Sequence, residues 1–178
     1  FEDNRIIPKF AIMNPEYTLG LPRFQTAAGV ADILSHLLER YFSDVKNTDV
    51  TDYLIEGAVK ALMVNGKKLN SDLQDYNARA EIQWLATIAH NNLLDTGRIG
   101  DWGSHRIEHE LSGQYGITHG EGMAIVLPAW IRYTAKVKPK KLAQLAVRVF
   151  GADTFNNTEE ENALYLAEVL ENFFKELG

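Results

Sequence analysis

The chain has 178 residues, 46% of them apolar and 24% charged, which is typical of a soluble globular protein and long enough for one sizeable core. It contains no cysteine, so disulfides and thiolate metal ligands are excluded, and we expect a protein of the reducing cytoplasm. The net charge of −6 argues against nucleic acid as a partner, because phosphate binding requires a basic face, and no apolar run is long enough to cross a membrane.

The first part of the chain predicts an extended segment followed by a helix. Residues 5–13 form a short apolar run broken by a proline, which indicates one strand or an extended lead-in, and a turn follows at Asn14. From residue 26 to residue 42 the apolar positions recur with helical spacing. Asp32 and His36 lie inside this apolar pattern rather than on a solvated face, which is the first sign of a functional site.

Helical periodicity continues through the rest of the chain, and capping residues, glycines and prolines mark the helix ends. The predicted helices cover residues 48–65, closed by Gly66; about 70–92, capped by Asn70 or Ser71; 104–115, closed by Gly113 or Gly116; 119–127, with Pro128 bending or breaking the helix; 139–150, closed by Gly151; and a last helix opened by a capping box at 158–161. The polar residues 95–103 predict a loop. The expected fold class is therefore all-α.

Two polar segments carry candidate metal ligands. Asp32 and His36 are four residues apart, so a helix places them on one face, and three of the five histidines, His105, His109 and His119, fall close together in the sequence. A carboxylate and an imidazole among apolar neighbours are costly to bury without a strong partner, and a cation is such a partner. We expect the two segments to meet and to hold Fe²⁺ or Zn²⁺, with one position left open for a substrate oxygen.

Simpler interpretations exist for the same residues. Asp32 and His36 could form an ordinary side-chain pair, which contributes about 0.2–0.5 kcal/mol. The three clustered histidines could belong to a polar surface helix and the turn after it. His90 has no acidic residue or histidine three or four positions away, so we expect it to be structural or exposed.

A different metal motif overlaps the histidine segment. Residues 105–109 match the H-x-x-E-H pattern of inverzincin metalloproteases, which suggests a metal-dependent hydrolase as an alternative. That alternative gives no role to Asp32, His36 or His119, and it needs a further acidic ligand from the glutamates at 159–161, which suit the first turn of a helix better. A second alternative is a non-catalytic helical module in which the histidines only happen to cluster.

The order and spacing of several segments between Phe10 and Pro128 are similar to those of a known family. The segments are FAIMNP at 10–15, YT at 17–18, LP at 21–22, GVADILSH at 29–36, WGSH at 102–105, HEL at 109–111, HG at 119–120 and AIVLP at 124–128. They resemble the iron-containing (group III) metal-dependent alcohol dehydrogenases, most closely the NAD(P)H-dependent butanol dehydrogenase and aldehyde reductase branch.

This resemblance implies a ligand set and a reaction. It implies that the metal ligands are Asp32, His36, His105 and His119. It also implies that His109 is a non-ligand histidine near the nicotinamide, with a proton-relay role, while Trp102 is a candidate wall of the substrate pocket or plain core. The reaction would be reversible hydride transfer between NAD(H) or NADP(H) and a short-chain aldehyde such as butanal, in a homodimer.

The resemblance also implies an incomplete enzyme. In this family a Rossmann-like half carries the glycine-rich pyrophosphate site, and no glycine-rich phosphate loop follows a strand in this chain. Residues 1–178 are therefore expected to be the metal-binding helical domain, like the C-terminal half of the dehydroquinate synthase-like and iron-containing alcohol dehydrogenases, itself shortened at its C-terminal end. Its first partner would be its own N-terminal cofactor domain, and the chain alone is expected to be inactive.

Overall fold

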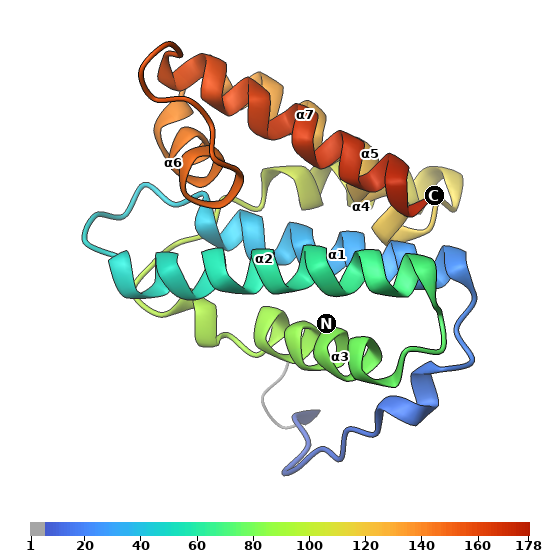
Figure 1. Cartoon of the computed structure of the whole chain (residues 1–178). Helices are drawn as coiled ribbons and strands as arrows, with labels where there is room; N and C mark the ends of the chain where they lie inside the picture. The colour runs from blue at the N-terminus through green and yellow to red at the C-terminus, as the bar shows by residue number, and fades with distance from the viewer. Residues whose placement is uncertain (1–5) are drawn as a thin grey trace.

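The computed structural model describes residues 6–178, and this part of the chain is all-helical, as predicted (Figure 1). No β-strand occurs among these residues. The α-helices are α1 (Arg23–Tyr41), α2 (Asp49–Ser71), α3 (Tyr76–His90), α4 (Gly103–Tyr115), α5 (His119–Ala135), α6 (Pro139–Phe150) and α7 (Glu159–Leu177), and two short 3₁₀ turns are η2 (Pro15–Thr18) and η3 (Leu93–Asp95).

Helix α1 lies at the centre of the molecule and packs against α2, α3, α5 and α7. Leu34, Leu37 and Leu38 on this helix are fully buried. Buried side chains occupy more than one face of α1, which is the pattern of a helix surrounded by others. The apolar pattern of α1 therefore draws its two polar residues, Asp32 and His36, into the interior.

Helices α5, α6 and α7 form the C-terminal part of the fold, with α7 packed against both α5 and α6. The predicted capping box opens α7, because the backbone N–H of Glu161 donates to the hydroxyl of Thr158 and the Glu161 carboxylate accepts from the backbone of Thr158. Helix α5 continues through Pro128 to its end at Ala135, so of the two predicted alternatives at the proline, a bend or a break, the break is wrong. This long helix carries His119 on its first turn.

Two predicted helix boundaries are also wrong. Helix α2 does not end at Gly66 but runs on to Ser71. The glycine instead reflects close packing between α1 and α7, since a Cβ atom at this position would be 3.1 Å from Val30 Cγ1. Helix α3 does not begin at residue 70 or 71, since the side chain of Asp75 caps it by accepting from the backbone N–H of Ala78 at 3.0 Å. A glycine signals a helix end only when its own conformation requires it, and here the glycine lies where the packing leaves little room for a side chain.

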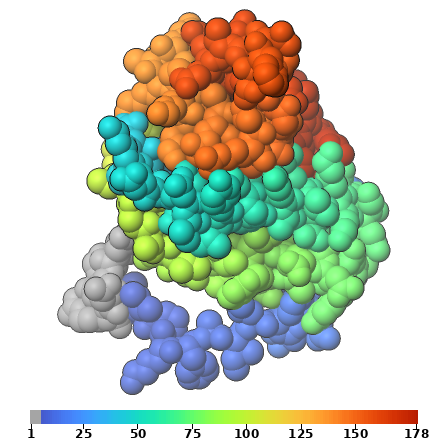
Figure 2. Space-filling view, turned by 60° about the vertical axis from the view of Figure 1, so that its left-hand side comes forward, coloured from blue at the N-terminus to red at the C-terminus, as the bar shows by residue number. Residues whose placement is uncertain are grey.

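The segment before α1 is extended and lies along α3, standing away from the rest of the body in the space-filling view (Figure 2). The side chain of Gln74 donates to the carbonyl of Leu19 at 2.9 Å. Of the predicted stretch 5–13, residue 5 lies outside the described residues, and residues 6–13 form no strand, so the strand alternative is wrong. Within the described residues, no helix combines the length and apolarity needed to span a bilayer.

Candidate metal centre

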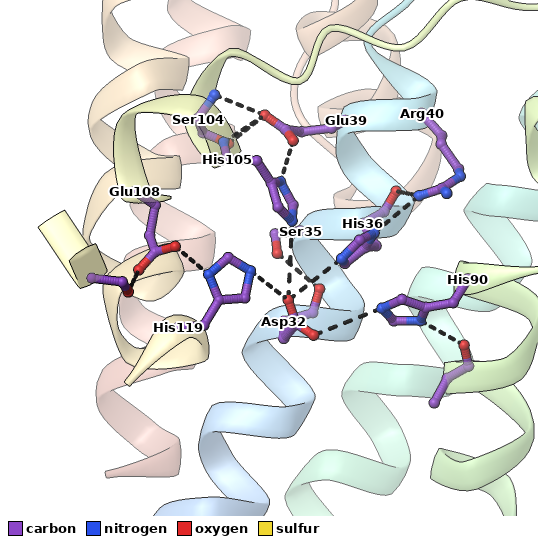
Figure 3. Close-up of polar contacts among 12 residues, drawn as sticks. Asp32, Ser35, His36, Glu39, Arg40, His90, Ser104, His105, Glu108 and His119 are labelled. Carbon is purple, nitrogen blue, oxygen red and sulfur yellow. Dashed lines mark hydrogen bonds and ion pairs between the residues drawn. The ribbon is translucent and has the colours of Figure 1, made fainter. Parts of the chain in front are cut away.

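Four polar side chains from the three helices α1, α4 and α5 come together in one cluster (Figure 3). Asp32 and His36 come from α1, His105 from α4 and His119 from the start of α5. The Nε2 atoms of the three histidines face one oxygen, Oδ1 of Asp32, at 3.3 Å for His119, 3.6 Å for His36 and 4.0 Å for His105. The four donor atoms all lie within 4.8 Å of one another. The fold thus brings together the four residues that the sequence analysis singled out.

The surroundings of these atoms fit a bound cation. Oδ1 of Asp32 and Nε2 of His105 are buried and have no hydrogen-bond partner in the described part of the chain, an arrangement that is costly without a further ligand. Donors about 2.0–2.1 Å from a tetrahedral ion lie roughly 3.3–3.4 Å from one another, which matches the 3.3 Å between His119 and Asp32, the shortest of the separations given above. Three imidazole nitrogens and one carboxylate suit Zn²⁺ or Fe²⁺ better than Ca²⁺ or Mg²⁺.

Glu39 fixes the orientation of His105. This glutamate is fully buried and accepts hydrogen bonds from the backbone N–H groups of Ser104 at 2.8 Å and His105 at 3.3 Å. It therefore caps the first turn of α4, where Trp102 occupies the N-cap position with φ 59° and provides no side-chain cap. The same carboxylate accepts from Nδ1 of His105, which leaves the lone pair on Nε2 pointing at Asp32.

Glu108 orients His119 in the same way. Its buried carboxylate accepts from Nδ1 of His119 and from the hydroxyl of Ser112. Two glycines on the first turns of α5 allow this helix to pack closely against α4 and α1. A Cβ atom on Gly122 would lie 2.4 Å from Glu108 Oε1, and a Cβ atom on Gly120 would lie 2.0 Å from the carbonyl oxygen of a residue on α1. Small residues at these positions let α5 come close enough for His119 to face Asp32.

His36 differs from the other two histidines. Its Nδ1 lies 3.1 Å from Nη1 of Arg40, which can only donate, so Nδ1 accepts in this arrangement. Burial, together with the nearby His90, lowers the pKa of His36 to about 3, which keeps the ring neutral. To present a lone pair at Nε2, His36 must carry its hydrogen on Nδ1, and Nδ1 then no longer accepts from Arg40. Arg40 keeps two other acceptors, the carbonyl oxygen of His36 at 3.1 Å and the carboxylate of Asp95 at 3.0 Å.

His90, like Glu39 and Glu108, is a residue of this site that sequence reasoning missed. Its Nδ1 donates to the carbonyl of Ala86 at 2.7 Å, and its Nε2 lies 3.7 Å from Oδ2 of Asp32. Both nitrogens face acceptors, and the contact with Asp32 raises the pKa of His90. Burial raises the pKa of Asp32, but the contacts with His90 and with the neighbouring histidine rings outweigh this and lower it. No sequence signal marks His90, because only the packing of α3 on α1 brings it to Asp32.

His109 and Trp102 lie at the edge of the cluster. His109 is exposed, and its ring centroid is 5.3 Å from that of His119 and 6.1 Å from that of His105. It is not one of the four converging donors, although it could share an ion with Glu108 and His119. Trp102 is half-buried, its ring centroid lies 5.3 Å from that of His105, and a guanidinium from α1 covers its face at 4.6 Å.

The hydrolase alternative finds little support in this geometry. In the H-x-x-E-H reading, His105, Glu108 and His109 would serve one ion, but the carboxylate of Glu108 is turned to His119 and Ser112. The glutamates at 159–161 begin α7, and Glu161 is engaged in its capping box.

Comparison with known proteins gives a consistent family. The model of the Fe-containing alcohol dehydrogenase family, C-terminal part, matches residues 26–178. A probable NADH-dependent butanol dehydrogenase of Bacillus subtilis is 39% identical over 173 residues, which cover 97% of this chain and 45% of that protein. The NADPH-dependent aldehyde reductase YqhD of Escherichia coli is 35% identical over 178 residues, which cover 100% of this chain and 46% of that protein.

Solved structures agree with these relatives. The substrate- and cofactor-free form of the Escherichia coli aldehyde reductase YqhD superposes with a TM-score of 0.93 at 34% identity, covering 100% of this chain and 46% of that one. The NADH-dependent butanol dehydrogenase A of Thermotoga maritima gives a TM-score of 0.92 at 37% identity, covering 99% and 44%. The chain thus spans less than half the length of the relatives it matches.

Proposed function

This chain belongs to the family of iron-containing alcohol dehydrogenases, matching its C-terminal part, and from this premise we propose that it is the metal-binding part of an alcohol dehydrogenase or aldehyde reductase. The ligands would be Asp32, His36, His105 and His119. The observation that carries the proposal is the convergence of three Nε2 atoms on the unpartnered, buried Oδ1 of Asp32. Fe²⁺ and Zn²⁺ both suit this donor set.

The reaction would be reversible hydride transfer between NAD(P)H and an aldehyde. When bound, the divalent ion supplies Lewis-acid polarisation of the substrate carbonyl. The coenzyme gives its hydride to the carbonyl carbon, and His109, or a water it orders, gives a proton to the carbonyl oxygen, so that the products are the alcohol and NAD(P)⁺. The exposed position of His109 beside His119 supports this role, because a proton donor must reach both the substrate and solvent.

The substrate would be a short-chain aldehyde such as butanal, in line with the names of the relatives. Trp102 would form one wall of the substrate pocket. Its ring packs edge-on against His36 and His105, with centroids 5.6 and 5.3 Å apart, which places an aromatic surface next to the proposed ligands.

The coenzyme would be held by a region outside this chain. The relatives are more than twice as long as the matched stretch, and their names include NADH- and NADPH-dependent enzymes. We therefore propose that residues 1–178 work together with an N-terminal cofactor domain, with the substrate between the two, and that the chain alone does not turn over an aldehyde.

Replacing His119 by alanine tests the ligand set. The variant His119→Ala should lose stoichiometric zinc while retaining its helical circular dichroism, because His119 is half-exposed and contributes little to the core. Zinc content after dialysis is the measurement, and His109→Ala is the matched control, expected to keep one zinc per chain. Full zinc content in His119→Ala would contradict the assignment.

A second measurement separates the classes of enzyme. The chain joined to its cofactor domain should oxidise NADH or NADPH in the presence of butanal and should not hydrolyse casein or simple esters. Hydrolysis without any coenzyme turnover would favour the hydrolase alternative instead.

A further inference from the structure

The carboxylate of Asp32 has its two oxygens in different surroundings (Figure 3). Oδ1 faces the Nε2 atoms of three histidines at 3.3–4.0 Å and has no hydrogen-bond partner among the described residues. Oδ2 faces away from that cluster, towards Nε2 of His90 at 3.7 Å. This division is what a carboxylate needs if one oxygen binds an ion and the other is held by the protein.

The ring of His90 is itself fixed. Its Nδ1 donates to the carbonyl of Ala86 at 2.7 Å, one turn earlier on α3, and its ring centroid lies 4.0 Å from that of His36. His90 therefore touches both of the α1 side chains that the proposed site uses. Its side chain is 40% exposed, so it adds little to the buried core, and these contacts are the main interactions that depend on it.

We propose that His90 is a positioning residue of the metal centre, which holds Asp32 through Oδ2 so that Oδ1 faces the three imidazoles, and which supports the ring of His36 from the side of α3. This inference rests on the proposed function, since it takes Asp32 and His36 as ion ligands. His90 is not itself a ligand here, because it is absent from the group of four converging donors.

The physical reason is the rotational freedom of a carboxylate. Without a partner on Oδ2, Asp32 can turn about its terminal torsion, which is broad, and in part of the population the rotated carboxylate directs neither oxygen at the ion. Loss of a group that holds a ligand from behind typically reduces metal affinity by about 10–100-fold.

Three substitutions separate the contacts of His90. His90→Phe keeps an aromatic ring beside His36 and removes both nitrogens, His90→Leu removes the ring as well, and His90→Gln places an amide near the position of Nε2. Zn²⁺ affinity of the chain is measured by competition with a chromogenic chelator, and the visible spectrum of the Co²⁺-loaded chain reports the coordination geometry. Glu81→Phe, at an exposed position on the same helix, controls for added apolar surface.

We expect His90→Phe and His90→Leu to bind Zn²⁺ about 10–100-fold more weakly than the unchanged chain and to alter the Co²⁺ spectrum, while His90→Gln and Glu81→Phe stay within about threefold. Affinities within about twofold for His90→Phe and His90→Leu, with an unchanged Co²⁺ spectrum, overturn the role of His90 and leave the metal centre intact. A loss in His90→Gln as large as in His90→Phe also overturns it, because the polar contact would then not matter. An unchanged chain that binds no Zn²⁺ overturns the proposed function itself.

Discussion

At the scale of single residues, Glu39 links the fold to the site. One buried carboxylate caps the N-terminus of α4 and accepts from Nδ1 of His105. Charge-assisted hydrogen bonds of this kind are stronger than neutral ones, and the positive end of the helix dipole adds to them. The group that stabilises α4 is therefore also the group that selects the tautomer of His105.

We predict that Glu39→Gln weakens zinc binding by about 10–100-fold and lowers the free energy of unfolding by about 1–3 kcal/mol. A glutamine amide has one acceptor oxygen, so it cannot accept from both the start of α4 and the ring of His105. Chelator competition and urea denaturation are the two measurements. Glu110→Gln, on an exposed position of α4, is the control, and equal zinc affinity in both variants would show that Glu39 does not orient His105.

At the scale of the helices, the contact between α1 and α5 sets the distance across the site. Gly120 lies where α5 crosses α1, and a Cβ atom there would be 2.0 Å from the carbonyl oxygen of Ala28 and 2.6 Å from its carbonyl carbon. Both atoms belong to the backbone, so a change of side-chain rotamer cannot relieve the clash. His119 comes directly before Gly120, so any displacement of α5 moves its Nε2 away from Asp32.

Gly120→Ala should therefore lower the free energy of unfolding by about 1–3 kcal/mol and reduce zinc affinity. Gly57→Ala is the matched control, because Gly57 is an exposed residue within α2 whose added Cβ atom meets nothing within 4 Å. There, alanine should stabilise the chain by about 0.5–1 kcal/mol, since glycine is the poorer helix former. Thermal and urea unfolding of both variants would show opposite signs, and equal signs would contradict this account of Gly120.

At the scale of the whole molecule, Asp52 on α2 joins distant parts of the chain. Its carboxylate accepts from Arg98 at 2.7 Å, from Gln144 at 2.9 Å and from the ammonium of Lys141. Arg98, whose side chain is fully buried, also donates to the carbonyl of Arg40 at 3.0 Å at the end of α1. The network thus connects the loop that precedes α4 with three helices, α1, α2 and α6. These connections hold α4 in place against the site.

Removing this carboxylate should be costly, because Arg98 would keep a buried charge without its partner. We predict that Asp52→Asn lowers the free energy of unfolding by about 3–5 kcal/mol at pH 7, whereas Asp49→Asn, at an exposed position on α2, changes it by less than about 1 kcal/mol. Urea denaturation measures both. A loss below about 1 kcal/mol for Asp52→Asn would mean that the network contributes little.

The difference in free energy of unfolding between the unchanged chain and Asp52→Asn has a defined pH dependence. Burial raises the pKa of Asp52, but its hydrogen bonds with Lys141, Arg98 and Gln144 outweigh this and lower the pKa below its ordinary value of 3.8. A carboxyl with a depressed folded-state pKa contributes stability that is complete above the unfolded-state pKa and is lost as pH falls through the folded-state pKa. The difference between the unchanged chain and Asp52→Asn should therefore be constant above about pH 5 and shrink below about pH 4.

Much of the fold follows from local signals. The apolar spacing around Asp32 predicts α1, and the capping box at Thr158 predicts the start of α7. The failures have a common physical origin. Gly66 and Pro128 are helix terminators by local chemistry, yet both lie inside helices whose neighbours hold them in place, because burial between packed helices outweighs a propensity of about 1–3 kcal/mol.

The sequence by itself determined an all-helical chain through its periodicity, and its ordered motifs between Phe10 and Pro128 indicated the family. It also gave the residue types of a candidate ion site, since these depend on the chemistry of individual side chains. Only the tertiary structure decided which atoms face each other. The contacts of Glu39 with His105, of Glu108 with His119 and of His90 with Asp32 each join residues on different helices. Such contacts depend on how α1 packs against α3 and α5 and how α4 packs against α5, for which no local pattern carries a signal.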